Sequence, residues 1–432
     1  MSETSAGGMS RREFTKASAF ATFAILSARG ASAQANADTL RVGLIGCGGR
    51  GTGAAINHLT ENENVVIVAL ADAFEDRLKS CRQTITTKEG LKGKADVTDE
   101  MCFVGLDAYQ KLLATDVQLI LHATPPYARP THIAAAVDAG KHIFTEKPIA
   151  VDPTGVRLFI DAANKAKEKN LSFVTGTQRR HQKSYLDTIK KIQDGAVGDI
   201  LAARSYWCGG LPFSHERKPE WNDLEYRLRN WYNQCWTCGD NIVEQHIHNL
   251  DVINWVLGGH PEKVFASGGR AWKPNEERYG DIWDQFSCDY TYPNGVHVMS
   301  MSRHWNDSAG GVFEEVTGTK GKSNCRDMGE DDKDPYVQEH IDLVKSIRGE
   351  IPYINEGVQT AESTMTSIMG RMSAYTGQEL TWEEALNADL DIVPKDLAFE
   401  KEYPLGPIPV PGIAGKKAPA EKKERKERKK DA

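Results

Sequence analysis

The most constraining feature of the sequence is a glycine-rich turn near its N-terminus. Residues 40–45 form a short apolar run, and the letters GCGGRG follow at residues 46–51. This G-x-G-x-x-G pattern, between a buried strand and a helix, lets backbone amides approach the pyrophosphate of a dinucleotide. We therefore expect a strand over 40–45, a helix over 52–59 and a cofactor site between them. The predicted cofactor contacts in the turn are Gly46, Gly48, Gly49, Arg50 and Gly51.

An acidic residue follows at the distance that such a site requires. A second apolar run, residues 65–71, ends at Asp72, about 20 residues after the glycine turn. A carboxylate there accepts hydrogen bonds from both ribose hydroxyls and repels a 2′-phosphate, so the pattern favours NAD over NADP. The alternative interpretation of Asp72 is an ordinary turn or helix-capping carboxylate.

Further strands and helices alternate along the chain and predict a doubly wound parallel sheet. An apolar run at 117–123, a helical stretch at 128–139 and a short strand at 142–145 follow one another. Ligands bind at the carboxyl ends of the strands in such sheets, so we expect the residues around these ends at the cofactor. They add Thr124, Pro125, His132, Glu146 and Lys147 to the predicted cofactor contacts.

The sequence resembles the Gfo/Idh/MocA family of oxidoreductases from about residue 40 to about residue 385. The stretches that carry the resemblance are GLIGCGGRG, ATPPYARPTHIAAAVDAGKHIFTEKPIA, GTQRRHQKSYLDTIKKIQDGAVGDI and GDNIVEQHIHNLDVINWVLG. The resemblance implies a Rossmann domain, placed at 38–155, and an α/β domain at 156–400 with a large, mostly antiparallel open sheet. It also implies a homo-oligomer, a dimer or a tetramer. The predicted strands of the second domain are 264–271, 282–292, 297–303 and 313–318, and its predicted helices are 336–348 and 356–375.

Lys147 is the first predicted catalytic residue. It stands between Glu146 and Pro148 at the end of a predicted strand, and burial makes a lysine a usable general acid–base. The resemblance favours this role. The alternative is a surface lysine that pairs with Glu146.

The second catalytic cluster is the segment EQHIHNLD at residues 244–251. The resemblance aligns it with a family pattern Asp-x-Gly-x-His-x-x-Asp, in which the histidine contacts the reacting hydroxyl. It implies catalytic roles for His248 and Glu244, whereas His246 replaces the usual glycine. Two alternatives remain: His248 is a hydrogen-bonded core histidine, or Glu244, His246 and His248 share a face of an extended segment and bind zinc. Our prediction is that no metal is bound.

Polar residues after the strand expected at 172–176 suit a polyhydroxylated ligand. Together with the residues that surround His248, they form the predicted substrate contacts Arg180, His181, Tyr185, His246 and Asp251. Trp207, Trp221, Trp231 and Trp236 lie in or near a loop-rich stretch, where they stack on sugar rings or anchor the loops.

Composition excludes several classes of function. A formal net charge of −7 argues against nucleic acid as a partner. No run approaches the roughly 18 apolar residues of a membrane-spanning helix. Eight cysteines are too few for a disulfide scaffold in 432 residues, and the single Cys235-x-x-Cys238 pair is weak evidence for zinc or a disulfide.

Both ends of the chain read as segments outside the fold. Arg11 and Arg12, an apolar stretch at 17–28 and Ala-Ser-Ala at 31–33 resemble a twin-arginine export signal over residues 1–33. This predicts a periplasmic protein that leaves the cytoplasm folded, with its cofactor bound. The Pro-rich and basic residues 404–432 are predicted to be a disordered tail.

Together these features predict an NAD-dependent oxidoreductase that transfers hydride to or from a secondary hydroxyl or keto group of a sugar, sugar derivative or glycoside. One alternative is glycoside cleavage by oxidation, elimination and re-reduction. Another is a non-catalytic protein that retains NAD as a binding or sensor module.

Overall fold

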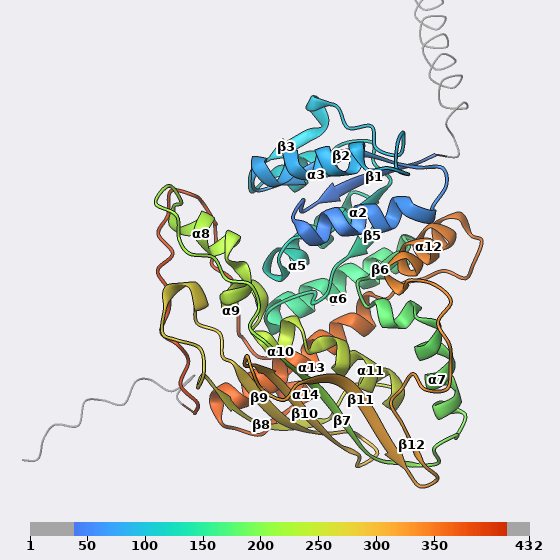
Figure 1. Ribbon diagram of the computed structural model, residues 1–432, viewed down its shortest axis with the longest axis vertical. Helices are drawn as coiled ribbons and strands as arrows, with labels where there is room; N and C mark the ends of the chain where they lie inside the picture. Colours follow the sequence, from blue (N-terminus) through green and yellow to red (C-terminus); the bar gives the residue numbers. More distant parts are fainter. Residues whose placement is uncertain (1–38, 413–432) are drawn as a thin grey trace, which may run out of the picture.

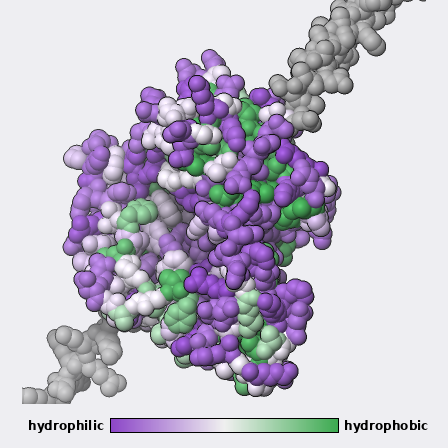
Figure 2. All heavy atoms as spheres, turned by 45° about the vertical axis from the view of Figure 1, so that its right-hand side comes forward, coloured by the Kyte–Doolittle hydropathy of each residue, from purple (hydrophilic) through white to green (hydrophobic). Residues whose placement is uncertain are grey.

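The computed structural model of the chain describes residues 39–412 and contains two β-sheets with helices around them (Figure 1). The predicted export signal and residues 413–432 of the predicted tail lie outside the described residues. Among residues 39–412, no helix is both long and apolar enough to cross a bilayer. Hydrophilic side chains predominate on the face shown in Figure 2, where the hydrophobic ones form small separate patches.

The first sheet is parallel, with the strand order β3-β2-β1-β4-β5-β6. Its strands are β1 (Leu40–Ile45), β2 (Val65–Asp72), β3 (Cys102–Val104), β4 (Leu119–His122), β5 (His142–Thr145) and β6 (Phe173–Thr175). The helices that connect them are α2 (Gly49–Glu61), α3 (Glu75–Thr87), α4 (Ala108–Leu113), α5 (Arg129–Asp138) and α6 (Pro153–Glu168). The central strands are apolar and buried on both faces, as parallel strands covered by helices must be.

Two details of this half differ from the prediction. Helix α2 begins at Gly49, because the glycine turn itself supplies the first helical residues. Strand β6 pairs with β5 in the parallel sheet, so the sheet extends to Thr175. The boundary predicted at residue 155 therefore separates β6 from its own sheet.

The second sheet has the order β12-β11-β7-β10-β9-β8-β13, and every neighbouring pair except β7 and β10 is antiparallel. Its strands are β7 (Ile200–Gly209), β8 (Lys263–Gly269), β9 (Gln285–Thr291), β10 (His297–His304), β11 (Gly311–Gly318), β12 (Lys322–Ser323) and β13 (Leu380–Thr381). The prediction of a Rossmann domain followed by a large, mostly antiparallel sheet is confirmed. Strand β7, an interior strand of this sheet, is not among the predicted strands.

Helices cover one face of the second sheet and connect it to the first half (Figure 1). The helices after the parallel sheet, some of which do not touch the second sheet, are α7 (Lys183–Gln193), α8 (Asp223–Arg229), α9 (Cys235–Cys238), α10 (Asn241–Glu244), α11 (Ile247–Leu257), α12 (Pro335–Arg348), α13 (Gly357–Thr376) and α14 (Trp382–Leu386). Helices α11 and α13 lie against the sheet, whereas α12 packs on α2 and α13 on α6. These contacts hold the two halves against each other.

The segment after α14 runs first along the parallel-sheet half and then along the second half. Its residues 404–412 make specific contacts there, whereas the sequence predicted that they belong to a disordered tail. The indole Nε1 of Trp283 donates a hydrogen bond to Pro409 O at 2.8 Å, and the Gly412 amide donates to Tyr375 O at 2.9 Å. Ile408 packs against the main hydrophobic core. These contacts hold residues 408–412 against the second half of the chain.

Candidate active site

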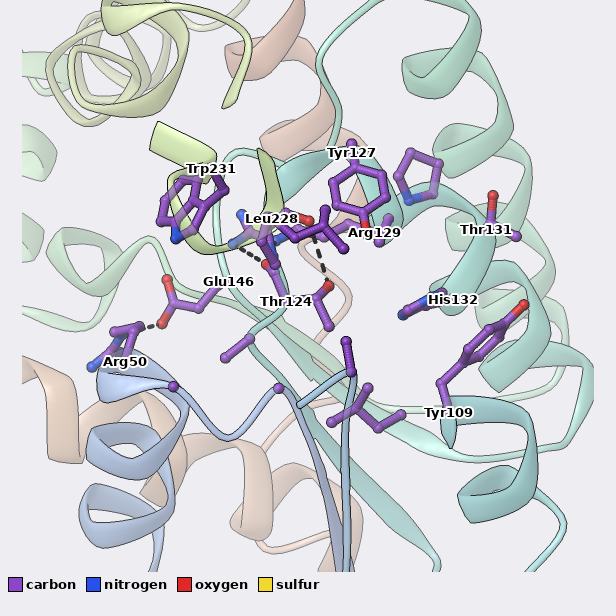
Figure 3. Close-up of a pocket in the computed structure, with 18 of the residues that line it drawn as sticks. Arg50, Tyr109, Thr124, Tyr127, Arg129, Thr131, His132, Glu146, Leu228 and Trp231 are labelled. Carbon is purple, nitrogen blue, oxygen red and sulfur yellow. Dashed lines mark hydrogen bonds and ion pairs between the residues drawn. The ribbon is translucent and has the colours of Figure 1, made fainter. Parts of the chain in front are cut away.

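One large cavity lies between the carboxyl ends of the parallel strands and segments of the second half (Figure 3). Its volume is about 1270 Å³, which exceeds the roughly 300–1,000 Å³ of ordinary ligand pockets. In Figure 3 the glycine turn lies below the cavity, Arg50 and Glu146 on one side, His132 and Tyr109 on the other, and Leu228 and Trp231 above. The cavity has room for a dinucleotide together with a second molecule.

The glycine turn is shaped by contacts that exclude side chains. Gly46 has φ +94°, and a Cβ on it would lie 2.7 Å from the backbone of Ala123 and Thr124; a Cβ on Gly51 would lie 1.8 Å from Gly46 O. A Cβ on Gly48 would meet only the mobile end of Arg77 at 3.1 Å. Gly46 and Gly51 therefore serve the fold, while Gly48 leaves space in front of the first amides of α2, where a phosphate binds.

Asp72 accepts two backbone hydrogen bonds and also lines the cavity. Its Oδ2 accepts a hydrogen bond from the Cys47 amide at 2.6 Å, and its Oδ1 accepts one from the Phe74 amide at 2.8 Å. The carboxylate also lines the cavity, and its remaining lone pairs are free for ribose hydroxyls. Burial raises the pKa of Asp72, although the two amide hydrogen bonds oppose this shift.

Arg50 points across the cavity to carboxylates rather than toward the ribose site of Asp72. Its Nε contacts Glu146 Oε1 at 2.5 Å, and its Nη2 lies 3.4 Å from Glu339 Oε1 on α12. Both carboxylates are buried. Since Glu146 and Glu339 neutralise it, Arg50 is a poor receptor for a 2′-phosphate, which agrees with NAD as the cofactor.

A chain of neutral histidines fixes Thr124. Thr124 Oγ1 lies 3.0 Å from His122 Nε2, which lies 3.1 Å from Nδ1 of His132, and the ring of His132 stacks on Tyr109 at 3.7 Å. Burial lowers the pKa of His132 to about 3 and that of His122 well below its usual value. Both rings are therefore uncharged at neutral pH.

Arg129 ties together the two loops that carry Thr124 and Lys147. Its Nε and Nη2 donate to Thr124 O at 2.9 and 2.7 Å, and its Nη1 donates to Pro148 O at 2.5 Å. Burial lowers the pKa of Arg129 to about 10, so it stays protonated at neutral pH. It positions the ends of β4 and β5 relative to each other.

Lys147 is buried and faces the second half of the chain. Its Nζ donates to Glu244 O at 2.6 Å and lies 3.3 Å from Glu244 Oε1, and both residues line the cavity. Glu146 pairs with Arg50 instead. The alternative of a surface lysine paired with Glu146 is therefore wrong.

His248 lies on the first turn of α11 and also lines the cavity. The Trp207 ring lies beside it, with centroids 5.9 Å apart and planes inclined by 23°. Burial lowers the pKa of His248 well below its usual value, and the charge of Lys147 lowers it further. Its imidazole is neutral and has a side open to the cavity.

None of the five predicted substrate contacts lines this cavity, because each is taken up by protein partners behind its wall. Arg180 pairs with Asp251 through Nη2 at 2.8 Å and Nε at 2.9 Å. His181 lies between Asp342 at 2.7 Å and Glu356 at 3.0 Å. We therefore reassign these residues to the structural support of the site.

Tyr185 and His246 complete this correction. The Tyr185 hydroxyl donates to Glu314 at 3.1 Å. His246 Nε2 lies 2.7 Å from Ser300 Oγ, so His246 turns away from His248 at the break between α10 and α11. The extended Glu-x-His-x-His face does not form, and residues 39–412 contain no group of three or more His, Cys, Asp or Glu side chains arranged for a metal ion. All eight cysteines are free thiols in the structure.

Several cavity residues were not predicted as site residues. An aromatic wall is built by Trp207, Phe213, Trp231 and Tyr232, and Gln178 and Gln245 add polar groups beside it. The cluster of tryptophans was the only signal of this wall in the sequence. Trp236 is instead an anchor that packs on Tyr127 at 5.2 Å, and Trp221 stacks on Tyr226 at 6.4 Å.

The other unpredicted wall is the segment 387–404, which we call the C-terminal clasp. Residues 391–397 line the cavity. The clasp is tied at one end by the Ile392 amide, which donates to Asp152 at 2.9 Å, and at the other by the Tyr403 amide, which donates to Asp223 on α8 at 2.9 Å. Between them, Phe399 packs on Phe74, two residues after Asp72, with ring centroids 6.2 Å apart. Figure 1 shows this red segment running beside α8.

Two models of protein families match the chain. "Oxidoreductase family, NAD-binding Rossmann fold" matches residues 40–173, and "GFO/IDH/MocA C-terminal domain" matches residues 185–323. Together they cover more than half of the chain, in the order of its two sheets. The chain belongs to the Gfo/Idh/MocA family of oxidoreductases. The predictions of this family and of NAD as the cofactor are confirmed.

Relatives of this Gfo/Idh/MocA protein act on several kinds of compound. The inositol 2-dehydrogenase/D-chiro-inositol 3-dehydrogenase of Halalkalibacterium halodurans is 28% identical over 234 residues, 53% of this chain and 56% of that protein. A glycosyl hydrolase family 109 protein of Shewanella pealeana is 26% identical over 195 residues, 45% of this chain and 39% of that protein. The chain spans about half the length of the curated relatives it matches.

A solved structure with a similar fold is scyllo-inositol dehydrogenase from Lactobacillus casei with bound NAD(H) and scyllo-inositol. It has a TM-score of 0.61 and 18% sequence identity, and the match covers 80% of this chain and 99% of that one. At this identity the likeness concerns the fold alone.

Proposed function

We propose that this oxidoreductase transfers hydride between NAD and a secondary hydroxyl or keto group of a sugar, sugar derivative or glycoside. The observation that carries the proposal is that Lys147, Glu244 and His248 face the same cavity as the glycine turn. The first amides of α2 would hold the pyrophosphate of a dinucleotide, and its nicotinamide end would then lie on the side of the cavity that these three residues line. Inositol-oxidising relatives support a polyhydroxylated ring as the substrate.

The side chains divide the proton chemistry between them. Lys147 Nζ has three N–H groups; two point to Glu244, and the third is free for the oxygen of the reacting hydroxyl. The unprotonated nitrogen of neutral His248 takes the hydroxyl proton while the C–H hydrogen leaves with its electron pair. Bound NAD supplies the hydride acceptor. The ammonium stabilises the oxygen as its negative charge develops, and its repulsion then favours release of the proton from His248 to water.

The test starts with the small molecules that the purified protein carries. Absorbance and mass of the supernatant after denaturation should reveal NAD(H). The loaded protein should then form NADH with members of a panel of inositols and methyl pyranosides, and Lys147→Met should abolish turnover while it keeps the cofactor. A protein that neither carries nor binds NAD would refute the proposal.

The C-terminal clasp supports a cofactor that stays bound through many turnovers. Residues 391–397 lie over the same cavity, and the aromatic contact of Phe399 with Phe74 closes the side near Asp72. Escape of NAD requires these contacts to open. A retained cofactor must be reoxidised in place, by a second substrate or within one catalytic cycle.

Glycoside cleavage by oxidation, elimination and re-reduction is the second candidate. The glycosyl hydrolase family 109 relative favours it, as does a cavity with room beyond the cofactor. Release of free sugar from a methyl glycoside without net NADH would identify this reaction. A third candidate, a sensor that retains NAD, predicts ligand binding without turnover that survives Lys147→Ala.

We further propose export by the twin-arginine pathway and assembly into a homo-oligomer. The open face of the second sheet carries Phe265, 60% exposed, and Met299, 44% exposed, in register across β8, β9 and β10. Fractionation of cells that express the full chain tests export through Arg11 and Arg12. Light scattering tests assembly, which Phe265→Asp should weaken.

A further inference from the structure

Three buried polar atoms on the wall of the cavity have no hydrogen-bond partner. Among the described cavity residues these are Tyr232 Oη, Glu244 Oε2 and Gln178 Oε1. A buried polar atom without a partner costs about 1–3 kcal/mol, so such atoms are rare and require an explanation. All three lie in the part of the chain after β6.

Tyr232 is held rigidly although its own hydroxyl bonds to nothing. It lies in the short turn Trp231–Asn233, which is tied on both sides: Asn233 Nδ2 donates to Phe213 O at 3.0 Å, and the Asp281 amide donates to Asn233 O at 3.2 Å. Its ring packs against Phe213 at 5.7 Å and His304 at 6.0 Å. The hydroxyl is therefore fixed before any ligand arrives.

Glu244 connects Tyr232 to the reacting groups. Its Oε1 lies 3.3 Å from Lys147 Nζ, while Oε2 of the same carboxylate is free. Ligand oxygens bound at Oε2 and at Lys147 Nζ would therefore be neighbours, as the hydroxyls on adjacent carbons of a ring are. Tyr232 lines the same cavity as Glu244 and Gln245. Burial raises the pKa of its phenol, the charge of Glu244 raises it further, and Gln245 opposes this shift.

We propose that Tyr232 Oη and Glu244 Oε2 bind a second substrate hydroxyl, on the carbon adjacent to the one that is oxidised. That hydroxyl donates to the carboxylate and accepts from the phenol. This inference rests on the proposed function and adds that the substrate is a vicinal diol. Tyr232 determines specificity through a contact that the sequence pattern of the family does not include.

The same atoms exclude an anionic group at this position. Glu244 Oε2 can only accept a hydrogen bond when it is ionised, so a carboxylate or phosphate beside it would be repelled and could not donate to it. A neutral hydroxyl satisfies one acceptor and one donor at once. A site built to hydrogen-bond a hydroxyl rejects the analogue that lacks it by large factors, up to about 10⁴–10⁵.

The test uses Tyr232→Phe, which removes only the hydroxyl and keeps the packed ring. Tyr226→Phe is the matched control, because Tyr226 lies in the same region but does not line the cavity, and its hydroxyl already donates to His215 O at 3.1 Å. The NAD-loaded protein is assayed for NADH formation with a panel of inositols and methyl pyranosides. The best substrate is then compared with its monodeoxy analogues at both neighbouring carbons.

We expect one neighbouring deoxy analogue to react at least about a hundredfold more slowly than the parent with the wild-type protein. Tyr232→Phe should lower kcat/KM for the parent substrate about tenfold to a hundredfold and leave kcat/KM for that deoxy analogue nearly unchanged. The ratio of the two kcat/KM values should therefore fall. Tyr226→Phe should keep the wild-type ratio of kcat/KM values, and the wild-type protein and both variants should carry equal amounts of NAD.

Three results overturn the inference. The first is that the wild-type protein oxidises the parent substrate and both neighbouring deoxy analogues equally well; this measurement does not depend on the folding of any variant. Tyr232→Phe keeps the wild-type discrimination. Tyr232→Phe slows parent and analogue equally. By contrast, a protein that retains NAD but neither oxidises nor binds any member of the panel refutes the proposed function and removes the basis of the inference with it.

Discussion

The proposed retention of NAD by the C-terminal clasp can be measured as the dissociation rate of the cofactor. Phe399 is half-buried in a small cluster with Phe74, Leu224 and Leu228, apart from the main core. Burying a whole phenylalanine side chain contributes about 1.5–3 kcal/mol, so Phe399→Ala removes about 1–1.5 kcal/mol of clasp closure. If release requires an open clasp, the dissociation rate of NAD rises about tenfold, since about 1.4 kcal/mol corresponds to a factor of ten.

The assay follows the fluorescence of bound NADH after addition of excess NAD, which does not fluoresce and replaces the NADH that dissociates. Val410→Ala is the control, because Val410 lies in the same C-terminal stretch but is 54% exposed and beyond the clasp. It should leave the release rate unchanged. Release at the wild-type rate from folded Phe399→Ala protein, or rapid release from the wild-type protein itself, would show that the clasp does not retain the cofactor.

Three further outcomes follow from the site and its support. Lys147→Met should lower kcat at least a hundredfold at unchanged NAD content, the usual scale for a lost acid–base group; a smaller loss contradicts its role. Gly51→Ala should prevent NAD binding and destabilise the fold because its methyl collides with Gly46 O, whereas Gly49→Ala, which meets nothing within 4 Å, should keep its melting temperature within a few degrees. Burial opposes a charge on His181, but Glu356 and Asp342 raise its pKa to about 10. The contribution of protonated His181 to the free energy of unfolding is therefore complete below about pH 6.5 and is lost as the pH rises through about 10. Urea unfolding across this range should show that decline for the wild-type protein and a flatter profile for His181→Asn.

The cofactor half was predictable from sequence because its signals are local. The apolar run of β1, the glycine turn and Asp72 are close in sequence and keep the same relation in space. The roles of Lys147 and His248 needed the family resemblance, since only the fold brings them to one cavity. The helix break at His246 turns this side chain away from His248, so the two histidines do not form a metal site. Residue spacing in the sequence does not reveal that break.

The substrate half was less predictable because its charges pair over long distances in the chain. Arg180 finds Asp251, and His181 finds Glu356, and these partners turn apparent ligand contacts into structural ion pairs. Tyr232 has no neighbouring polar residue in sequence that signals a site. Its significance appears only when its hydroxyl is found buried, without a partner, on the cavity wall.

The C-terminal position of the clasp also determines when the clasp is synthesised relative to the cavity that it covers. During synthesis the six strands of the parallel sheet, which end at Thr175, emerge long before residues 387–404. N-terminal units fold first on the ribosome, so the pocket around the glycine turn forms while it still lacks its outer wall. If the clasp retains NAD as proposed, the cofactor would bind to the nascent protein before residues 387–404 close over the cavity.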